Sequence, residues 1–122
     1  MVPAEHDLRV PLGADFTHEF SLFNCEEAAE STLYAPVSLF DTDVVVSVKR
    51  YLSDSQKTLH TWDSATDSRV KVIPHEGTFL LSLSDADVSE FDREHSYDVF
   101  LRDAAGRMIC VVQGKIFPER PF

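Results

Sequence analysis

Serine, histidine and aspartate, the residue types that build many hydrolytic active sites, are abundant in this sequence. No serine stands in the Gly-x-Ser-x-Gly context that exposes a nucleophile at a strand-to-helix turn. The chain has four glycines, and no phosphate-cradling loop is present. His18 lies in an apolar strand pattern, where a core histidine bonded to a backbone carbonyl is more typical than a catalytic base; His60 and His75 flank turns. A small hydrolase would need a clustered acid–base pair, so the sequence predicts a protein that is not an enzyme.

Two acidic clusters and two cysteines supply the residue types that bind metal ions. Asp41–Asp43 (DTD) and Asp85–Asp87 (DAD) carry carboxylates, but a calcium loop needs about six oxygens, and the glycine and final glutamate of an EF-hand are missing. Cys25 and Cys110 are too few for a zinc site of about four ligands, and no Cys-x-x-Cys or His-x-x-x-His spacing occurs. We expect solvated acidic turns or a helix cap, two free thiols and no cofactor or metal.

Tyr51 and Trp62 are the residues that could face a ligand. Trp62 lies in LHTWDSATD, a polar context that predicts an exposed side chain. An exposed Trp62 beside Tyr51 could stack on a sugar or on a neighbouring protein. The alternative is that Trp62 packs as a satellite of the core.

The chain is an acidic polypeptide of 122 residues, a length that fits one domain spanning residues 1–122. Its net charge of −10 opposes binding to phosphate backbones and anionic membranes, so neither nucleic acid nor a membrane is expected as a partner. No apolar run approaches about 20 residues. The first residues, MVPAEHDLRV, lack a basic region followed by an apolar stretch, so we expect no signal peptide.

Apolar and polar residues alternate along most of the chain, a period typical of half-buried strands. Turn residues separate these runs at spacings of roughly ten residues, which predicts about seven to eight strands. Pro11 places the first strand at a sheet edge. The residues predicted to face the core are Leu8, Val10, Leu12, Phe16, His18, Phe20, Leu22, Val44, Val46, Val48, Val70, Val72, Phe79, Leu81 and Leu83. The pattern predicts an all-β fold, a single immunoglobulin-like antiparallel β-sandwich.

Helical structure is expected in short pieces only. Residues Glu26–Glu30 could form a short helix, or the connection 24–43 could be a loop that crosses between sheets. Ser84 is a suitable N-cap with acidic residues in the turn that follows, and only about two turns can form there. Val88 and Phe91 would dock this turn under the sheet.

The segment SYDVFLRDAAGRMICVVQGKIF predicts a β-hairpin. Asp103–Gly106 has the residue choice of a type I turn followed by a glycine in the left-handed conformation. This turn pairs Leu101 with Ile109 and Val99 with Val111, which places them on one apolar face. The opposite face is also apolar and carries Phe100, Met108, Cys110, Val112 and Ile116.

The second apolar face of this hairpin needs a cover. The chain itself could supply one, through an N-terminal arm (1–7) or the connection 24–43. A partner subunit could dock there instead, because an exposed apolar area of this size usually marks an interface. A C-terminal tail, 118–122, would extend that interface together with Phe117 and its own Phe122, since its two prolines keep it extended.

The order of these segments resembles a family of small β-sandwich domains in virion proteins of tailed bacteriophages. The matching stretches are GADFTHEFSLFN, APVSLFDTDVVVSVKR, GTFLLSLSDADVSEF and SYDVFLRDAAGRMICVVQGKIFPERP. They cover the chain from about Leu8 to Pro118 and form a pattern of strands and turns, without a catalytic signature. Members usually have a short Asp-Gly turn where this chain has the longer NCEEAAESTLYA.

The resemblance implies a non-enzymatic structural or assembly protein of a virion, assembled in the host cytoplasm. Members serve in baseplates, tail tips, necks and capsid decorations, so the expected partners are other head or tail proteins in a multi-copy assembly. The alternative is a recognition module that binds a glycan or a host surface through Tyr51, Trp62 and the nearby turns. No cofactor is expected for either function.

Overall fold

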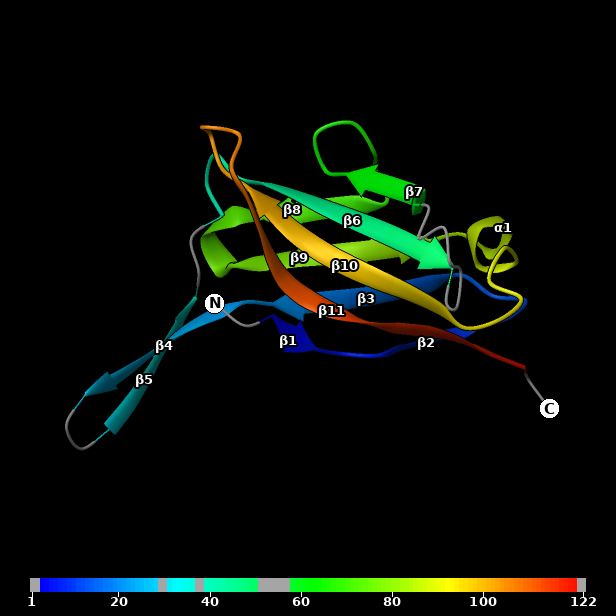
Figure 1. The fold of residues 1–122 in the computed structure, drawn as a ribbon, viewed down its shortest axis with the longest axis horizontal. Helices are drawn as coiled ribbons and strands as arrows, with labels where there is room; N and C mark the ends of the chain where they lie inside the picture. The colour runs from blue at the N-terminus through cyan, green and yellow to red at the C-terminus, as the bar shows by residue number, and fades with distance from the viewer. Residues whose placement is uncertain (1–2, 29–30, 37–38, 51–57, 121–122) are drawn as a thin grey trace.

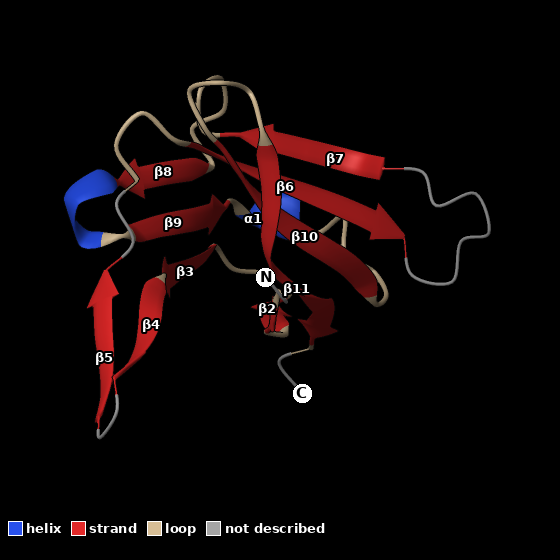
Figure 2. Ribbon diagram, turned by 60° about the vertical axis from the view of Figure 1, so that its left-hand side comes forward, coloured by secondary structure: helices blue, strands red, loops and turns tan. Residues whose placement is uncertain are grey.

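Two β-sheets pack face to face in this protein (Figures 1 and 2). The computed structural model describes residues 3–28, 31–36, 39–50 and 58–120, and for 23–28 and 31–36 it describes the backbone alone. The larger sheet, called sheet A, has six strands: β1 (Ala4–Glu5), β2 (Leu8–Pro11), β6 (Asp43–Arg50), β7 (Thr58–Asp63), β10 (His95–Arg102) and β11 (Met108–Glu119). The smaller, sheet B, has three: β3 (Phe16–Ser21), β8 (Val70–Ile73) and β9 (Thr78–Leu83).

The order and direction of the strands show how each sheet is paired. Sheet A follows the order β1-β11-β10-β6-β7, with β2 also beside β11, and sheet B follows β3-β9-β8. Neighbouring strands are antiparallel, except that β1 and β2 run parallel to β11. The prediction of an all-β sandwich is confirmed, but its pairing is mixed where a wholly antiparallel one was expected. Pro11 lies on β2 at the predicted sheet edge.

Alternating side chains of both sheets fill the space between them. Val44, Val46 and Val48 of β6 are at most 1% exposed, and so are Phe79 and Leu81 of β9. These strands therefore face the core as the alternation predicted. Fully burying one such side chain stabilises the fold by about 1.5–3 kcal/mol, so this layer dominates the free energy of unfolding.

The connection 24–43 contains a hairpin of its own, formed by β4 (Phe23–Ala28) and β5 (Ser31–Pro36). The helix considered for Glu26–Glu30 is wrong where the structure describes it, because β4 pairs antiparallel with β5 and places Cys25 opposite Tyr34. Among the described strands, these two pair only with each other. The hairpin projects away from the two sheets in both views (Figures 1 and 2).

The predicted helical turn is present as α1 (Asp85–Val88). The Ser84 hydroxyl accepts the Asp87 N–H, and the Asp87 carboxylate accepts the Ser84 N–H, which forms a capping box. Val88 and Phe91 are fully buried, so this turn closes one end of the core as expected. A short 3₁₀ turn, η1 (Pro74–Glu76), joins β8 to β9.

The turn between β10 and β11 has the predicted geometry. The Gly106 N–H donates to the Asp103 carbonyl at 2.9 Å, and Gly106 has a φ of 84°, which a residue with a side chain rarely adopts. The Asp103 N–H donates to the Arg107 carbonyl at 3.0 Å. Leu101 pairs with Ile109, as the turn required.

Beyond that turn the register differs from the prediction. Phe100 pairs with Cys110, but Val99 pairs with Val112 and not with Val111, because a bulge lies between Val99 and Phe100. The extra residue reverses the alternation along β11. Val112 and Ile116 therefore face the core, where they are 4% and 0% exposed, and the prediction that they share the outward face with Phe100 is wrong.

Both chain ends contribute to one edge of sheet A. The predicted N-terminal arm (1–7) contains β1, and its His6 N–H donates to the Gln113 carbonyl at 2.9 Å. The Tyr97 hydroxyl donates to the His6 carbonyl. At the other end, the predicted tail 118–122 begins inside β11, because Pro118 pairs with Val10 and its neighbour Glu119 accepts the Leu12 N–H.

Candidate functional site

The surface of sheet A that points away from sheet B is called here the outer face. Three of the predicted interface residues come together on it: Phe100 of β10 lies opposite Cys110 of β11, and Met108 lies two pairs further along, opposite Arg102. Val45 of β6 lies on the other side of Phe100 and is 5% exposed, because β7 and β10 carry larger side chains beside it. Met108 is 49% exposed. The apolar centre of the outer face is therefore Val45, Phe100, Met108 and Cys110.

An ion-pair cluster borders one end of this apolar centre. The Arg102 guanidinium donates to both carboxylate oxygens of Asp63, at 2.7 and 3.1 Å, and to Asp43 at 2.9 Å. These hydrogen bonds join three neighbouring strands, β10, β6 and β7. The hydrogen bond from Arg102 holds the pKa of Asp63 below its ordinary value. The guanidinium is thus fixed in place by two acidic partners.

A second ion pair lies at the other end of the apolar centre, near the thiol of Cys110. Lys49 Nζ is 3.9 Å from Asp98 Oδ2. Cys110 is a free cysteine, as predicted, and its Sγ donates to the Val112 carbonyl at 3.6 Å. Burial, and then the charge of Asp98, raise the pKa of this thiol. Cys110 is therefore suited to packing and not to nucleophilic attack; the side chain of Cys25 lies outside what the structure describes.

The Trp62 side chain is buried. It is 5% exposed, because it pairs with the inward-facing Val46 and so points under sheet A. Its ring stacks on His60 at a centroid distance of 5.5 Å and meets Phe91 edge-on at 6.5 Å. The expected exposure is wrong, and the alternative of a packing role is confirmed. Tyr51, the other residue of that predicted surface, lies outside the described residues.

Phe117 lies away from the apolar centre. It pairs with Arg9 at the β2–β11 edge, and Arg9 Cζ lies 5.5 Å from the centre of its ring. Its partly exposed ring is therefore covered in part by a cation–π contact within the chain. Phe122 lies outside the described residues.

His18 has a partner that the sequence did not indicate. It is half-buried, and its Nε2 lies 3.0 Å from Nε2 of His6 on the N-terminal arm, where a bond to a backbone carbonyl was expected. Burial, and then the neighbouring His6, lower the pKa of His18. The pair joins the arm of sheet A to strand β3 of sheet B.

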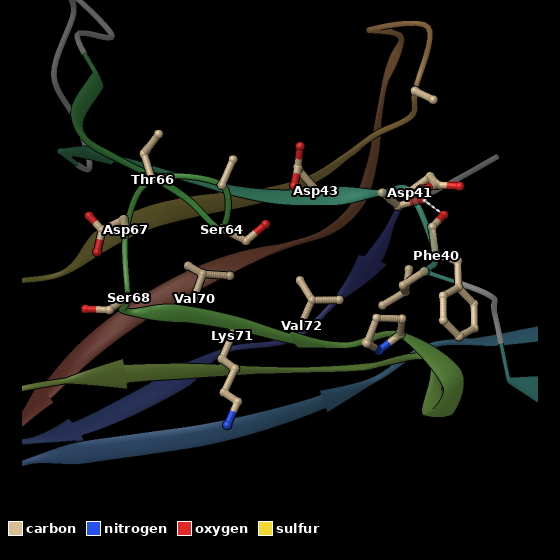
Figure 3. Close-up of a pocket in the computed structure, with 15 residues that line it drawn as sticks. Phe40, Asp41, Asp43, Ser64, Thr66, Asp67, Ser68, Val70, Lys71 and Val72 are labelled. Atoms are coloured by element: carbon tan, nitrogen blue, oxygen red, sulfur yellow. Dashed lines mark hydrogen bonds between the residues drawn. The ribbon is translucent and has the colours of Figure 1, made fainter.

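A groove of about 820 Å³ opens beside β8, between the segment 39–43 and the turn after β7 (Figure 3). Its lining includes the apolar residues Leu39, Val70 and Val72 and the carboxylates of Asp41, Asp43 and Asp67. Sequence reasoning missed this groove, since its walls come from three separate segments. The signal in the sequence was the acidic cluster Asp41–Asp43, which was interpreted as a solvated turn.

The described residues contain no group of three or more His, Cys, Asp or Glu side chains placed to bind a metal ion. In the DAD cluster, Asp87 caps α1 and accepts two hydrogen bonds from Arg69, at 2.9 and 3.0 Å, which confirms the predicted helix cap. Arg69, and in smaller part Ser84, lower the pKa of Asp87 to about 2. The same part of the chain contains no helix with the length and apolar character needed to cross a bilayer.

Comparison with known proteins does not assign the chain to a family. No model of a known protein family matches the chain, and no curated protein sequence matches it.

Proposed function

We propose that the chain is a non-enzymatic structural subunit of a bacteriophage virion, which docks on another head or tail protein through the outer face of sheet A. The observation that supports docking is the apolar centre around Phe100 and Met108, in which Met108 is 49% exposed and which has ion pairs at both ends. Protein interfaces have this arrangement of an apolar centre with a polar rim. The resemblance of the strand and turn order to virion domains supports the choice of assembly.

The polar rim would orient the partner. Arg102 is held by Asp43 and Asp63, so it loses little side-chain freedom when a partner approaches. Charged rims contribute specificity and association rate more than affinity. A small apolar centre gives a weak single contact, and repetition of that contact around a particle would hold many copies by avidity.

The test measures incorporation into particles. Particles are purified from the producing host, and the number of copies of the chain per particle is measured by quantitative mass spectrometry. Met108→Glu and Thr17→Glu variants each compete with the unaltered chain. Thr17 is an exposed β3 residue on the opposite side of the sandwich, so Thr17→Glu adds the same charge away from the outer face.

We expect Met108→Glu to reduce incorporation by about tenfold, as the loss of an interface hot spot does, and Thr17→Glu to leave it unchanged. Circular dichroism should show both variants folded. Absence of the chain from purified particles would reject the virion assignment. Equal incorporation of both variants would reject the outer face as the docking surface.

A further inference from the structure

Among the described strands, β8 lies at an edge of sheet B. It pairs with β9 on one side, and no described strand pairs with it on the other. The groove of Figure 3 runs along this second side and is lined by Val70, Lys71 and Val72 of β8 itself. An unpaired strand edge presents backbone donors and acceptors that another extended chain can use.

The alternation of hydrogen bonds along β8 shows which of its residues direct their backbone N–H and C=O groups toward the groove. The Ser82 N–H donates to the Arg69 carbonyl at 2.8 Å, so this opposite pair is a hydrogen-bonded pair of the β8–β9 ladder. Because such pairs alternate in antiparallel sheets, Lys71 is also bonded to β9, whereas Val70 and Val72 direct their N–H and C=O groups away from it. The Leu22 N–H donates to the Gly77 carbonyl, which gives β9 the same alternation from its β3 side.

The two ends of this edge are already closed by the chain. The Val70 N–H reaches the Asp67 carbonyl at 3.4 Å, and the Pro74 carbonyl accepts the Leu39 N–H at 3.2 Å. Within the described part of the chain, the edge groups left for a partner are the Val70 carbonyl and both backbone groups of Val72. They form a site for a segment of about three to five extended residues.

The groove selects the charge of that segment. Figure 3 shows Asp41, Asp43 and Asp67 on one side of β8, while the Lys71 side chain extends to the opposite side. Asp43 is paired with Arg102 and Asp67 with Arg69, whereas Asp41 is exposed. A second copy of this chain would bring a second set of carboxylates and a second net charge of −10, which opposes self-pairing.

We propose that β8 accepts a short extended segment of another protein as an added strand, with a basic side chain at the residue opposite Val72. The N–H of that residue donates to the Val72 carbonyl, and its carbonyl accepts the Val72 N–H. Its side chain points into the groove toward Asp41. Its two neighbours point to the Lys71 side, so uncharged residues fit there. This site adjoins the ion-pair cluster of the outer face through Asp43 but does not include Phe100 or Met108, so its failure leaves the proposed function unchanged.

The probe is the peptide acetyl-Val-Thr-Arg-Thr-Val-amide, titrated into the ¹⁵N-labelled full chain and followed by NMR. We expect saturable shifts of the amides of residues 70–72 and 39–41 below about 5 mM peptide. Replacing Arg with Glu should weaken binding by at least about threefold at low salt. Methylating the Arg backbone nitrogen removes its donor to the Val72 carbonyl, and binding should weaken by about fivefold to tenfold.

Two variants of the chain complete the test. Val72→Pro removes the outward N–H, which the β8–β9 ladder does not use, so the fold tolerates it and binding falls. Asp41→Asn removes the exposed carboxylate, and Asn also tolerates the positive φ of 56° at this position. Asp92→Asn, at an exposed residue that does not line the groove, is the control of equal charge and should bind as the unaltered chain does.

Three results would each overturn the proposal. The first is no amide shift at about 5 mM of the Arg peptide. The second is shifts confined to the outer face of sheet A. The third is equal binding of the N-methylated and unmethylated peptides, which would show that the β8 backbone is not paired; this readout holds even if Val72→Pro fails to fold.

Discussion

The backbone carbonyl of His6 lies directly over Gly114: a Cβ atom added to Gly114 would be 2.0 Å from the His6 oxygen and 2.7 Å from the His6 carbonyl carbon. Both clashing atoms belong to the backbone, so no side-chain rotation could relieve them. The N-terminal arm is therefore fitted against β11 at a position that only glycine allows.

Gly114→Ala should detach the arm from sheet A. The methyl group displaces His6, which breaks the hydrogen bond from its N–H to the Gln113 carbonyl. We expect a loss of about 1–3 kcal/mol in the free energy of urea unfolding, the range for forced overpacking. Hydrogen exchange of the His6 amide should accelerate at the same time. In a chain that lacks residues 1–7, Gly114→Ala should change the free energy of unfolding little. An equal loss of stability in that shortened chain would mean that the substitution does not act by displacing the arm.

The His6–His18 pair makes stability depend on pH. His18 has a folded-state pKa below its ordinary value of 6.5, because burial and His6 disfavour its charged form. The unfolded chain therefore binds the proton more readily. This contribution is complete above pH 6.5 and is lost as pH falls through the folded-state pKa.

His18→Gln isolates this effect, because the other titrating groups stay in both proteins. The free energy of unfolding is measured for each by urea denaturation at pH 7.5 and pH 5.5. We expect the advantage of the unaltered chain over His18→Gln to shrink at the lower pH. Glu19, which opposes the shift, remains in both proteins. An advantage that grows as pH falls would contradict the role given to the pair.

Val112→Asp and Met108→Asp test the bulge in β11. Val112 is buried against the core, so an unpaired carboxylate there should cost more than about 3 kcal/mol or prevent folding. Met108 lies on the outer face, so the same substitution should cost less than about 1 kcal/mol. Urea denaturation of both variants gives the comparison. Similar costs at both positions would mean that the alternation continues without a bulge.

The sequence predicted most strands because polar residues mark one face of each. On β9, Ser82 lies between Leu81 and Leu83, so one face was evident. In β11, the run Met108–Val112 contains no charged residue, and Val111 and Val112 are identical, so nothing in the pattern could show that one of them is extra. The wrong prediction that Val112 and Ile116 lie on the outward face follows from this missing signal.

The candidate site was predictable only where it lies within one hairpin. Phe100 and Met108 were correctly predicted to lie on the same face of the hairpin, because the Asp103–Gly106 turn fixes their register. The hydrogen bonds from Arg102 to Asp43 and Asp63 join three strands, and pairing between distant strands is not encoded locally. Trp62 was misplaced because its polar neighbours are the outward residues of the same strand, and a one-residue difference in register exchanges the two faces.

The parallel pairing of β1 and β2 with β11 also sets the order in which the chain can fold. The Asp7 carboxylate accepts the Lys115 N–H across a separation of 108 residues. Closing so large a loop costs conformational entropy before any contact repays it, and folds rich in distant contacts form slowly. Strands β1 and β2 are synthesised before β11, so until β11 is made their backbone groups stay open to other chains.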